Sequence, residues 1–109
     1  MTVSDIRKEE NVKDVVKLMN NTYKVFYNDG SIAIRHFNTD IIVNYPDGKV
    51  KVTVYESMTT RKRLGQFRDQ YPFITRYESG KGRYAIINNK RIYFKYSIIV
   101  KKNKVLEVN

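Results

Sequence analysis

The sequence predicts an α+β fold, in which antiparallel β-hairpins form a curved sheet packed with two short helices. Turn motifs of Asn, Asp, Pro and Gly separate short segments with alternating apolar residues, which is typical of hairpins. Two other segments carry apolar residues at helical spacing. The expected order is one helix, four strands, a second helix and three or four strands, an order typical of α+β rather than alternating βαβ folds.

The first helix is expected over about residues 11–19, with Ser4 as a rival cap for an earlier start. Asn11 resembles an N-cap residue, and Asp14 follows three residues later. Four apolar residues then occur at positions i, i+3, i+4 and i+7, namely Val12, Val15, Val16 and Met19. The pair Asn20-Asn21 would end this helix.

Two hairpins are expected next. In the first, strands 23–27 and 31–37 flank Asn28-Asp29-Gly30, a tight turn whose residues tolerate positive φ. In the second, strands 40–45 and 49–55 flank Pro46-Asp47-Gly48, and the valines at 50, 52 and 54 alternate with polar residues.

A second helix is expected over about 60–70, capped by Thr59 or Thr60 and stopped by Pro72. Leu64, Phe67 and Tyr71 would form its narrow apolar seam. A third hairpin, of strands 73–77 and 83–87, would follow around the turn 79–82. The alternation over 91–100 predicts one long strand, and 105–108 would pair back as a short last strand.

The length of 109 residues and the composition, 41% hydrophobic and 29% charged, predict a single globular domain over 1–109. No apolar run approaches the ~20 residues that span a bilayer, and the N-terminus lacks the layout of a signal peptide. We therefore expect an intracellular protein without membrane association. With no cysteine and one histidine, we also expect no metal site, and no motif calls for a cofactor.

The positive charge is concentrated in the C-terminal half. The net charge is +10, of which residues 1–55 contribute +1 and residues 56–109 contribute +9. A basic half suggests a polyanionic partner such as nucleic acid. The alternative is codon bias, because Lys, Asn, Ile and Tyr have A/T-rich codons and together make up 43 of the 109 residues.

No catalytic motif is present. There is no phosphate-binding loop, nucleophile elbow or paired-histidine motif, and Ser79-Gly80-Lys81-Gly82 has the length and order of a turn. His36 near Asp40 could act as a general acid or base, but no nucleophile is indicated beside them. The sequence therefore predicts a protein that is not an enzyme, with no catalytic residue.

Two basic regions are candidate nucleic-acid contacts. In the second helix these are Arg61, Arg63 and Arg68, whose planar guanidinium groups suit phosphate. In the C-terminal hairpin they are Lys81, Arg83, Arg91, Tyr93 and Lys95, a combination of charge and aromatic surface that binds single strands. The alternatives are a solvated outer face of the helix and ordinary cross-strand pairing on an exposed sheet face.

The segments 36–42, 46–50 and 58–64, followed by Gly82-Arg83-Tyr84, resemble a family of small uncharacterised proteins of tailed phages and prokaryotic viruses, including archaeal ones. The shared pattern is an apolar strand ending in Thr-Asp, an Asp-Gly hairpin and a Thr-Thr-x-x-Arg helix start, and it covers about residues 23–87. Gly65 stands where Asn is usual, and Tyr84 where Trp is common. The resemblance implies a viral accessory protein acting in the host cytoplasm and transfers no catalytic role.

Two functional hypotheses follow from the sequence. The first is a viral accessory protein that binds DNA or RNA through its basic C-terminal half. The second is a modulator that binds an acidic host protein and makes no contact with nucleic acid. An enzyme ranks third, and the sequence leaves the oligomeric state open.

Overall fold

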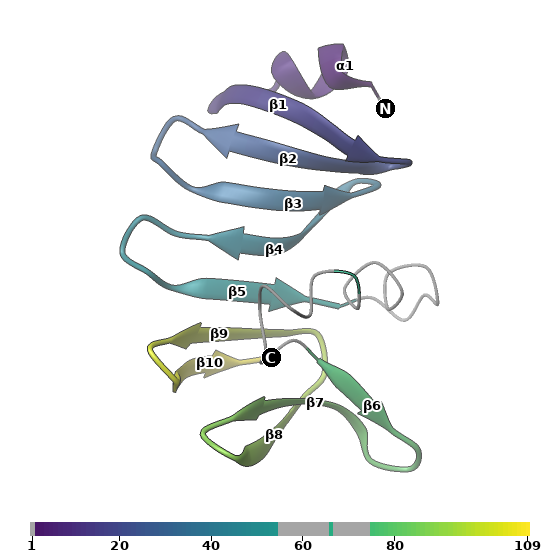
Figure 1. The fold of residues 1–109 in the computed structure, drawn as a ribbon, viewed down its shortest axis with the longest axis vertical. Helices are drawn as coiled ribbons and strands as arrows, with labels where there is room; N and C mark the ends of the chain where they lie inside the picture. The colour runs from purple at the N-terminus through teal and green to yellow at the C-terminus, as the bar shows by residue number, and fades with distance from the viewer. Residues whose placement is uncertain (1, 55–65, 67–74) are drawn as a thin grey trace.

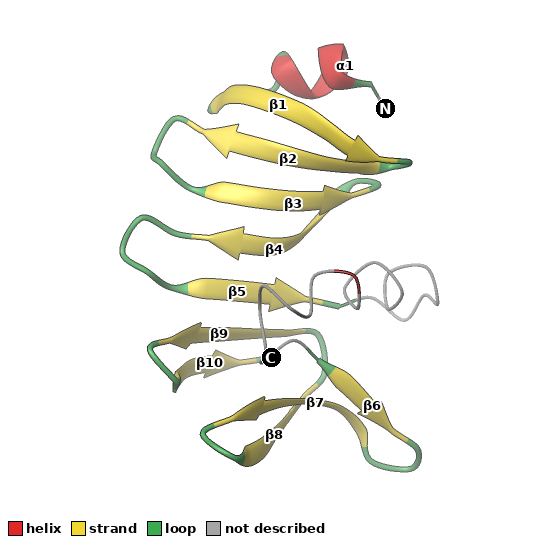
Figure 2. Ribbon diagram, viewed as in Figure 1, coloured by secondary structure: helices red, strands yellow, loops and turns green. Residues whose placement is uncertain are grey.

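The computed structural model describes residues 2–54, 66 and 75–109, and these residues fold largely as β-structure. The described residues contain the helix α1 (Val3–Arg7) and ten strands in two antiparallel sheets (Figures 1 and 2). The predicted α+β class with two short helices is therefore wrong. The strands are β1 (Val12–Met19), β2 (Thr22–Tyr27), β3 (Ile32–His36), β4 (Thr39–Asn44), β5 (Val50–Thr53), β6 (Arg76–Glu78), β7 (Gly82–Ile87), β8 (Lys90–Phe94), β9 (Ser97–Lys101) and β10 (Lys104–Val108).

The larger sheet has seven strands in the order β1-β2-β3-β4-β5-β9-β10, and the smaller sheet has the order β6-β7-β8. Neighbours in the larger sheet follow one another along the chain except at β5 and β9. Between these two strands the chain leaves the larger sheet, builds the smaller one and returns (Figure 1). This excursion places the β9–β10 hairpin beside β5. Strand β5 belongs to residues 1–55, the electrically balanced half of the sequence, which has a net charge of only +1.

The predicted helix over 11–19 is instead the edge strand β1, paired with β2. The register of β1 shifts between Val12 and Asp14 and again between Lys17 and Met19. Such bulges interrupt the two-residue alternation of a strand, so the apolar residues of β1 fall at helical spacing by coincidence. The helix that does form, α1, is earlier, and the side chain of Thr2 caps it in a capping box with Asp5.

The hairpin predictions are confirmed. β2 pairs with β3 around residues 28–30, β4 with β5 around 46–48, and β6 with β7 around 79–82. The predicted short last strand is confirmed as β10, which pairs with β9. The helix expected over 60–70 and its apolar seam lie outside the described residues, apart from Gln66.

The single long strand predicted over 91–100 is wrong, because it is two strands in different sheets. The chain bends at Lys95 and Tyr96, where the N–H groups of residues 95, 96 and 97 all donate to the main-chain oxygen of Asn109, at 2.6–3.2 Å. The bend interrupts the expected alternation at Tyr96 and Ser97. Ser97 is therefore buried, while the side chain of Tyr96 is half exposed.

Two apolar clusters hold the fold together. The larger lies between the sheets and combines Ile42, Val52 and Ile98 of the seven-stranded sheet with Ala85 and Phe94 of the small one. The smaller cluster lies under α1, where Ile6 packs with residues of β1, β2 and β3. The small sheet therefore packs against the larger one through residues such as Ala85 and Phe94. The β6–β7 end of the small sheet lines a groove, which is described next.

Candidate nucleic-acid interface

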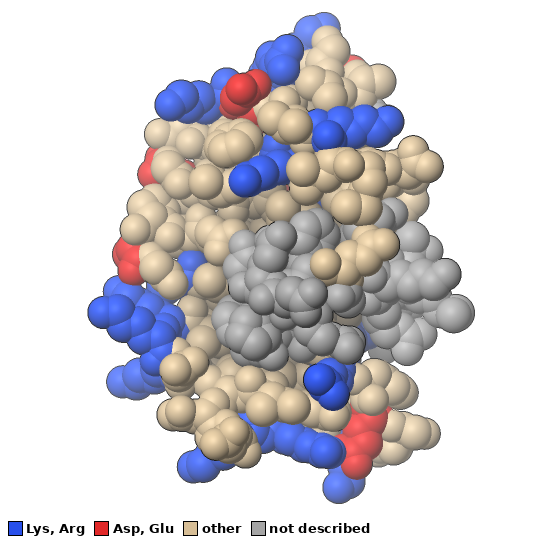
Figure 3. All heavy atoms as spheres, viewed as in Figure 1, with Lys and Arg blue, Asp and Glu red and all other residues tan. Residues whose placement is uncertain are grey.

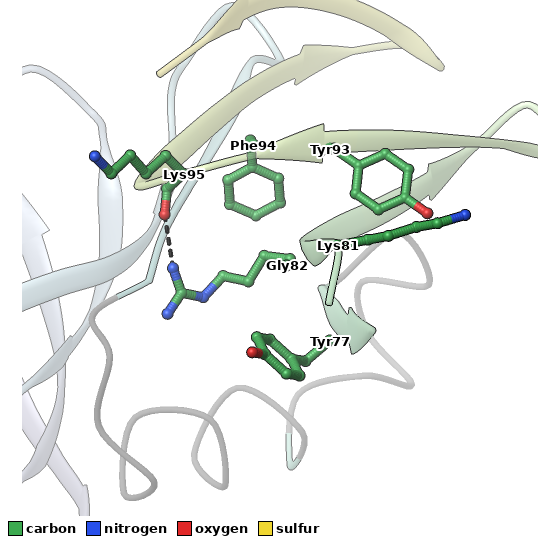
Figure 4. Close-up of a pocket in the computed structure, with 7 residues that line it drawn as sticks. Tyr77, Lys81, Gly82, Tyr93, Phe94 and Lys95 are labelled. Carbon is green, nitrogen blue, oxygen red and sulfur yellow. Dashed lines mark hydrogen bonds between the residues drawn. The ribbon is translucent and has the colours of Figure 1, made fainter. Parts of the chain in front are cut away.

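A groove of about 400 Å³ opens at the β6–β7 end of the small sheet (Figure 4). Four of the eight residues predicted to contact nucleic acid line it, namely Lys81, Arg83, Tyr93 and Lys95. Three further residues complete its described lining, and these are Tyr77, Gly82 and Phe94. The structure thus brings together residues that are up to 18 positions apart in the sequence.

The strand register explains how the groove is built. Tyr77 of β6 lies opposite Arg83 of β7, and Arg83 lies opposite Phe94 of β8. These three side chains therefore form one row across the sheet. Gly80 and Gly82 have φ values of +83° and +93°, which let the chain turn tightly between β6 and β7 and place Lys81 at the edge of the groove.

Arg83 lines the groove and has no carboxylate partner among the residues that the structure describes. Its side chain donates one hydrogen bond, from Nη1 to the main-chain carbonyl of Lys95 at 2.6 Å, drawn dashed in Figure 4. Its Nε atom is buried and has no hydrogen-bond partner among the described residues, and no described carboxylate lies within 4 Å. Because only 9% of the residue is exposed, its positive charge is largely shielded from water. Such a charge is costly unless an anion compensates it.

Two aromatic rings, of Tyr77 and Phe94, share the sheet face of Arg83, whereas Tyr93 pairs with Tyr84 on the opposite face and lines one end of the groove. Figure 4 shows Tyr77 and Phe94 on opposite sides of the groove, with Tyr93 and Lys81 towards one end and Lys95 towards the other. Phe94 is buried in the core, whereas Tyr77 and Tyr93 are 57% and 39% exposed. Exposed aromatic rings next to cations provide stacking surfaces for unpaired bases.

One predicted contact, Arg91, lies outside the lining of the groove. Its Nη1 atom pairs with Glu78 Oε2 at 3.1 Å, and its guanidinium carbon lies 4.7 Å from the centre of the Tyr84 ring. The same carboxylate oxygen accepts a 2.6 Å hydrogen bond from the Tyr93 hydroxyl. This hydrogen bond is the main cause of a lowered pKa at Glu78, and the nearby charges of Lys81 and Arg91 also contribute. Glu78 therefore stays ionised and offsets the charge of Arg91.

Arg61, Arg63 and Arg68 lie outside the described residues. Sequence reasoning missed Tyr77, Gly82 and Phe94. A signal for Tyr77 was present, because a hairpin centred on residues 79–82 places it opposite Arg83. Phe94 falls within the single strand predicted over 91–100, which the bend at Lys95 divides between the two sheets.

A second cluster of charged side chains, centred on Arg35 of β3, lies on the larger sheet. The guanidinium of Arg35 donates to Asp40 Oδ1 at 2.7 Å, to Glu9 Oε2 at 2.6 Å and to the Tyr27 hydroxyl at 2.9 Å. The Tyr27 hydroxyl also donates to Asp40. Burial, together with the carboxylate of Asp40, raises the pKa of Tyr27 to about 12. Asp40, which the sequence offered as an orienting partner for His36, is thus held by Arg35 and Tyr27, and the ring of His36 contacts Thr22 and Phe37.

Within the described ranges, no three His, Cys, Asp or Glu side chains are placed to hold a metal ion. The described part of the chain also contains no helix with the length and apolar character needed to cross a membrane. No protein-family model, curated protein or solved structure matches this chain. The resemblance to viral proteins therefore stays a prediction.

Proposed function

We propose that this protein binds single-stranded nucleic acid in the groove of the small sheet. The observation that carries the proposal is Arg83, whose shielded positive charge faces a groove bordered by exposed tyrosines. Its guanidinium would bind a phosphate, since the planar fork of arginine makes paired hydrogen bonds to phosphate oxygens. Unpaired bases would stack on Tyr77 and Tyr93.

The charge around the groove supports a polyanion as the ligand. Residues 75–96, which contain the small sheet, include six basic residues and one acidic residue, a net charge of +5. The one acid, Glu78, is already bound to Arg91 and Tyr93. The ammonium groups of Lys81 and Lys95 would add contacts to neighbouring phosphates, which position the strand without reading its sequence.

A single strand fits this arrangement better than a duplex. In a duplex the bases are stacked on one another, so their flat faces are not available to protein side chains. A single strand offers each base as a stacking partner, and its binding depends little on sequence. The resemblance to viral proteins suggests the setting of the proposal, an accessory protein that acts on nucleic acid in the host cytoplasm.

The proposal is tested by fluorescence anisotropy at low salt, with a labelled single strand of twelve nucleotides, the duplex of the same sequence and an acidic peptide of poly-glutamate. We expect the single strand to bind more tightly than the duplex or the peptide. Binding of the peptide without binding of either nucleic acid would contradict the proposal. It would favour instead the second sequence hypothesis, an acidic host protein as partner.

A matched pair of tyrosine variants locates the site. Tyr77→Ala removes an exposed ring that lines the groove, whereas Tyr96→Ala removes a similarly exposed ring that does not line it. Loss of one stacked base costs ~1–3 kcal/mol, or about 5- to 150-fold in affinity. We expect that loss for Tyr77→Ala and a change of less than about twofold for Tyr96→Ala. Equal effects of the two variants would show that the nucleic acid does not bind in the groove.

A further inference from the structure

The topology builds a second basic surface, away from the groove, from residues far apart in the sequence. Lys101 of β9 lies directly opposite Lys104 of β10. On its other side β9 pairs with β5, with Val100 opposite Val50 and Ile99 opposite Lys51. Continuing this register by one residue places Lys49 beside Lys101. Alternation then places on one face of the sheet a group that we call the lysine row, Lys49, Lys51, Lys101 and Lys104.

Two acidic residues accompany the lysine row: Asp47, and Glu107, which lies opposite Ile99 and therefore on the same face as Lys51. The Nζ atom of Lys49 pairs with Asp47 Oδ2 at 3.3 Å, and the lowered pKa of Asp47 owes more to the N–H of Lys49 than to the charges of Lys49 and Lys101. Lys51, Lys101 and Lys104 have no described carboxylate within 4 Å. Figure 3 shows basic side chains gathered at the left edge, where Figure 1 places the β4–β5 and β9–β10 turns.

Folding alone does not favour this arrangement. Like charges directly opposite each other across an antiparallel pair are destabilising, and Lys101 and Lys104 form such a pair. A bound polyanion would remove the repulsion. Lysine ammonium groups bind phosphate as point charges without fixed geometry. The Nζ atom of Lys49 lies over the ring of Tyr45, 5.5 Å from the ring centre, so this ring is covered by a lysine of the row and is not a free stacking surface.

We infer that the lysine row binds the sugar–phosphate backbone of the same nucleic-acid strand whose unpaired bases occupy the groove. This inference rests on the proposed function. It adds a second contact, which binds the charged phosphates and makes no contact with the bases. Two contacts on one strand make the second binding event intramolecular, which raises affinity only for strands long enough to reach both.

The length of the nucleic-acid strand can be chosen to distinguish binding in the groove from binding to the lysine row. At ~3.4 Å per nucleotide, six nucleotides span ~20 Å and twenty-four span ~80 Å. The longest dimension of the described structure is 40 Å. A strand of twenty-four nucleotides is therefore long enough to reach both contacts, and we expect a strand of six, which spans half the longest dimension, to occupy the groove alone.

The experiment compares both strands on the wild-type chain and on a variant that combines Lys49→Gln, Lys51→Gln, Lys101→Gln and Lys104→Gln. The matched control removes the same charge elsewhere, through Lys8→Gln, Lys13→Gln, Lys17→Gln and Lys24→Gln. We expect the lysine-row variant to bind six nucleotides as the wild type does, within about twofold. For twenty-four nucleotides we expect at least about tenfold weaker binding at low salt, with a salt dependence flatter by about 3 in log–log slope.

The control variant should retain most of the wild-type affinity and slope for twenty-four nucleotides. Unchanged binding of twenty-four nucleotides by the lysine-row variant, with six nucleotides still bound, would overturn the inference and leave the proposed function standing. Equal losses in the two lysine variants would also overturn it. Failure of the wild-type chain to bind either strand would overturn the proposed function itself.

Thermal melts of both variants report folding, and removal of the lysine row should not lower the melting temperature.

Discussion

Arg83 donates a 2.6 Å hydrogen bond to the main-chain carbonyl of Lys95, at the point where the chain bends out of the small sheet. This bond fixes the guanidinium in the groove while leaving its other donors without a partner among the described residues. Of the five N–H donors of this guanidinium, the one on Nε is buried and one on Nη1 is used, so a phosphate would be bound by the remaining donors of the two terminal nitrogens.

The first prediction concerns the stability of Arg83→Met. A buried charge without a counter-ion is costly, so an apolar side chain of similar length at the same place removes that cost. We therefore expect the melting temperature of this variant to equal or exceed that of the wild type, even though nucleic-acid binding is weakened. A lower melting temperature would show that Arg83 holds the small sheet together, and its role would then be structural.

The second prediction concerns Glu78, which offsets positive charge beside the groove. Glu78→Gln removes the carboxylate bound by Arg91 and Tyr93, so Arg91 becomes available to phosphate. One additional phosphate contact on a single strand should make the log–log salt slope steeper by ~0.7. The matched control is Glu10→Gln, an exposed acid in the balanced half, which should leave the slope unchanged. Identical slopes for both variants would place Arg91 and Glu78 outside the interface.

The third prediction concerns the ion-pair cluster of Arg35. Arg35→Met leaves Glu9 and Asp40 without the guanidinium that binds both. Breaking a buried pair typically costs 3–5 kcal/mol, and we expect about 3 kcal/mol here because the two carboxylates keep some contact with water. Arg7→Gln breaks an exposed pair with Asp14 and should cost less than ~1 kcal/mol. Urea unfolding measures both, and similar costs would show that the Arg35 cluster adds little.

The fourth prediction concerns alkaline pH. Burial and the carboxylate of Asp40 raise the pKa of Tyr27 from 10.0 to about 12. Between these values the unfolded chain has lost the proton that the folded chain retains, so the free energy of unfolding falls as pH rises. The stabilisation is complete below about pH 10 and is lost as pH passes 12. In urea titrations from pH 10 to 12, the free energy of unfolding of Tyr27→Phe should fall less than that of the wild type. If the two free energies fall in parallel with pH, the raised pKa does not belong to Tyr27.

The sequence predicted the hairpins well because their determinants are local. Gly30 and Gly48 adopt positive φ in the turns where Asn-Asp-Gly and Pro-Asp-Gly predicted them. The strand β1 was missed because its two bulges imitate helical spacing. Asn11, taken as a helix cap, has a φ of 69° and belongs to a turn, and both roles are common for asparagine.

The features that sequence reasoning missed depend on contacts between distant residues. The bend at Lys95 and Tyr96 is stabilised by Asn109, which no pattern within 91–100 reveals. Lys49 and Lys51 belong to the electrically balanced half, yet the pairing of β5 with β9 places them beside Lys101. The charge of a surface is therefore set by sheet topology as well as by the charge of a segment.

The most direct test of the groove as a nucleic-acid site is the salt dependence of binding to a strand of six nucleotides, measured by anisotropy for the wild type and Arg83→Met. Contacts from Lys81, Arg83 and Lys95 predict a log–log slope of about −2 for the wild type. Arg83→Met should flatten this slope by ~0.7 and weaken binding at every salt concentration. Superimposable curves for the two proteins would contradict the assignment of Arg83 as the phosphate-binding residue.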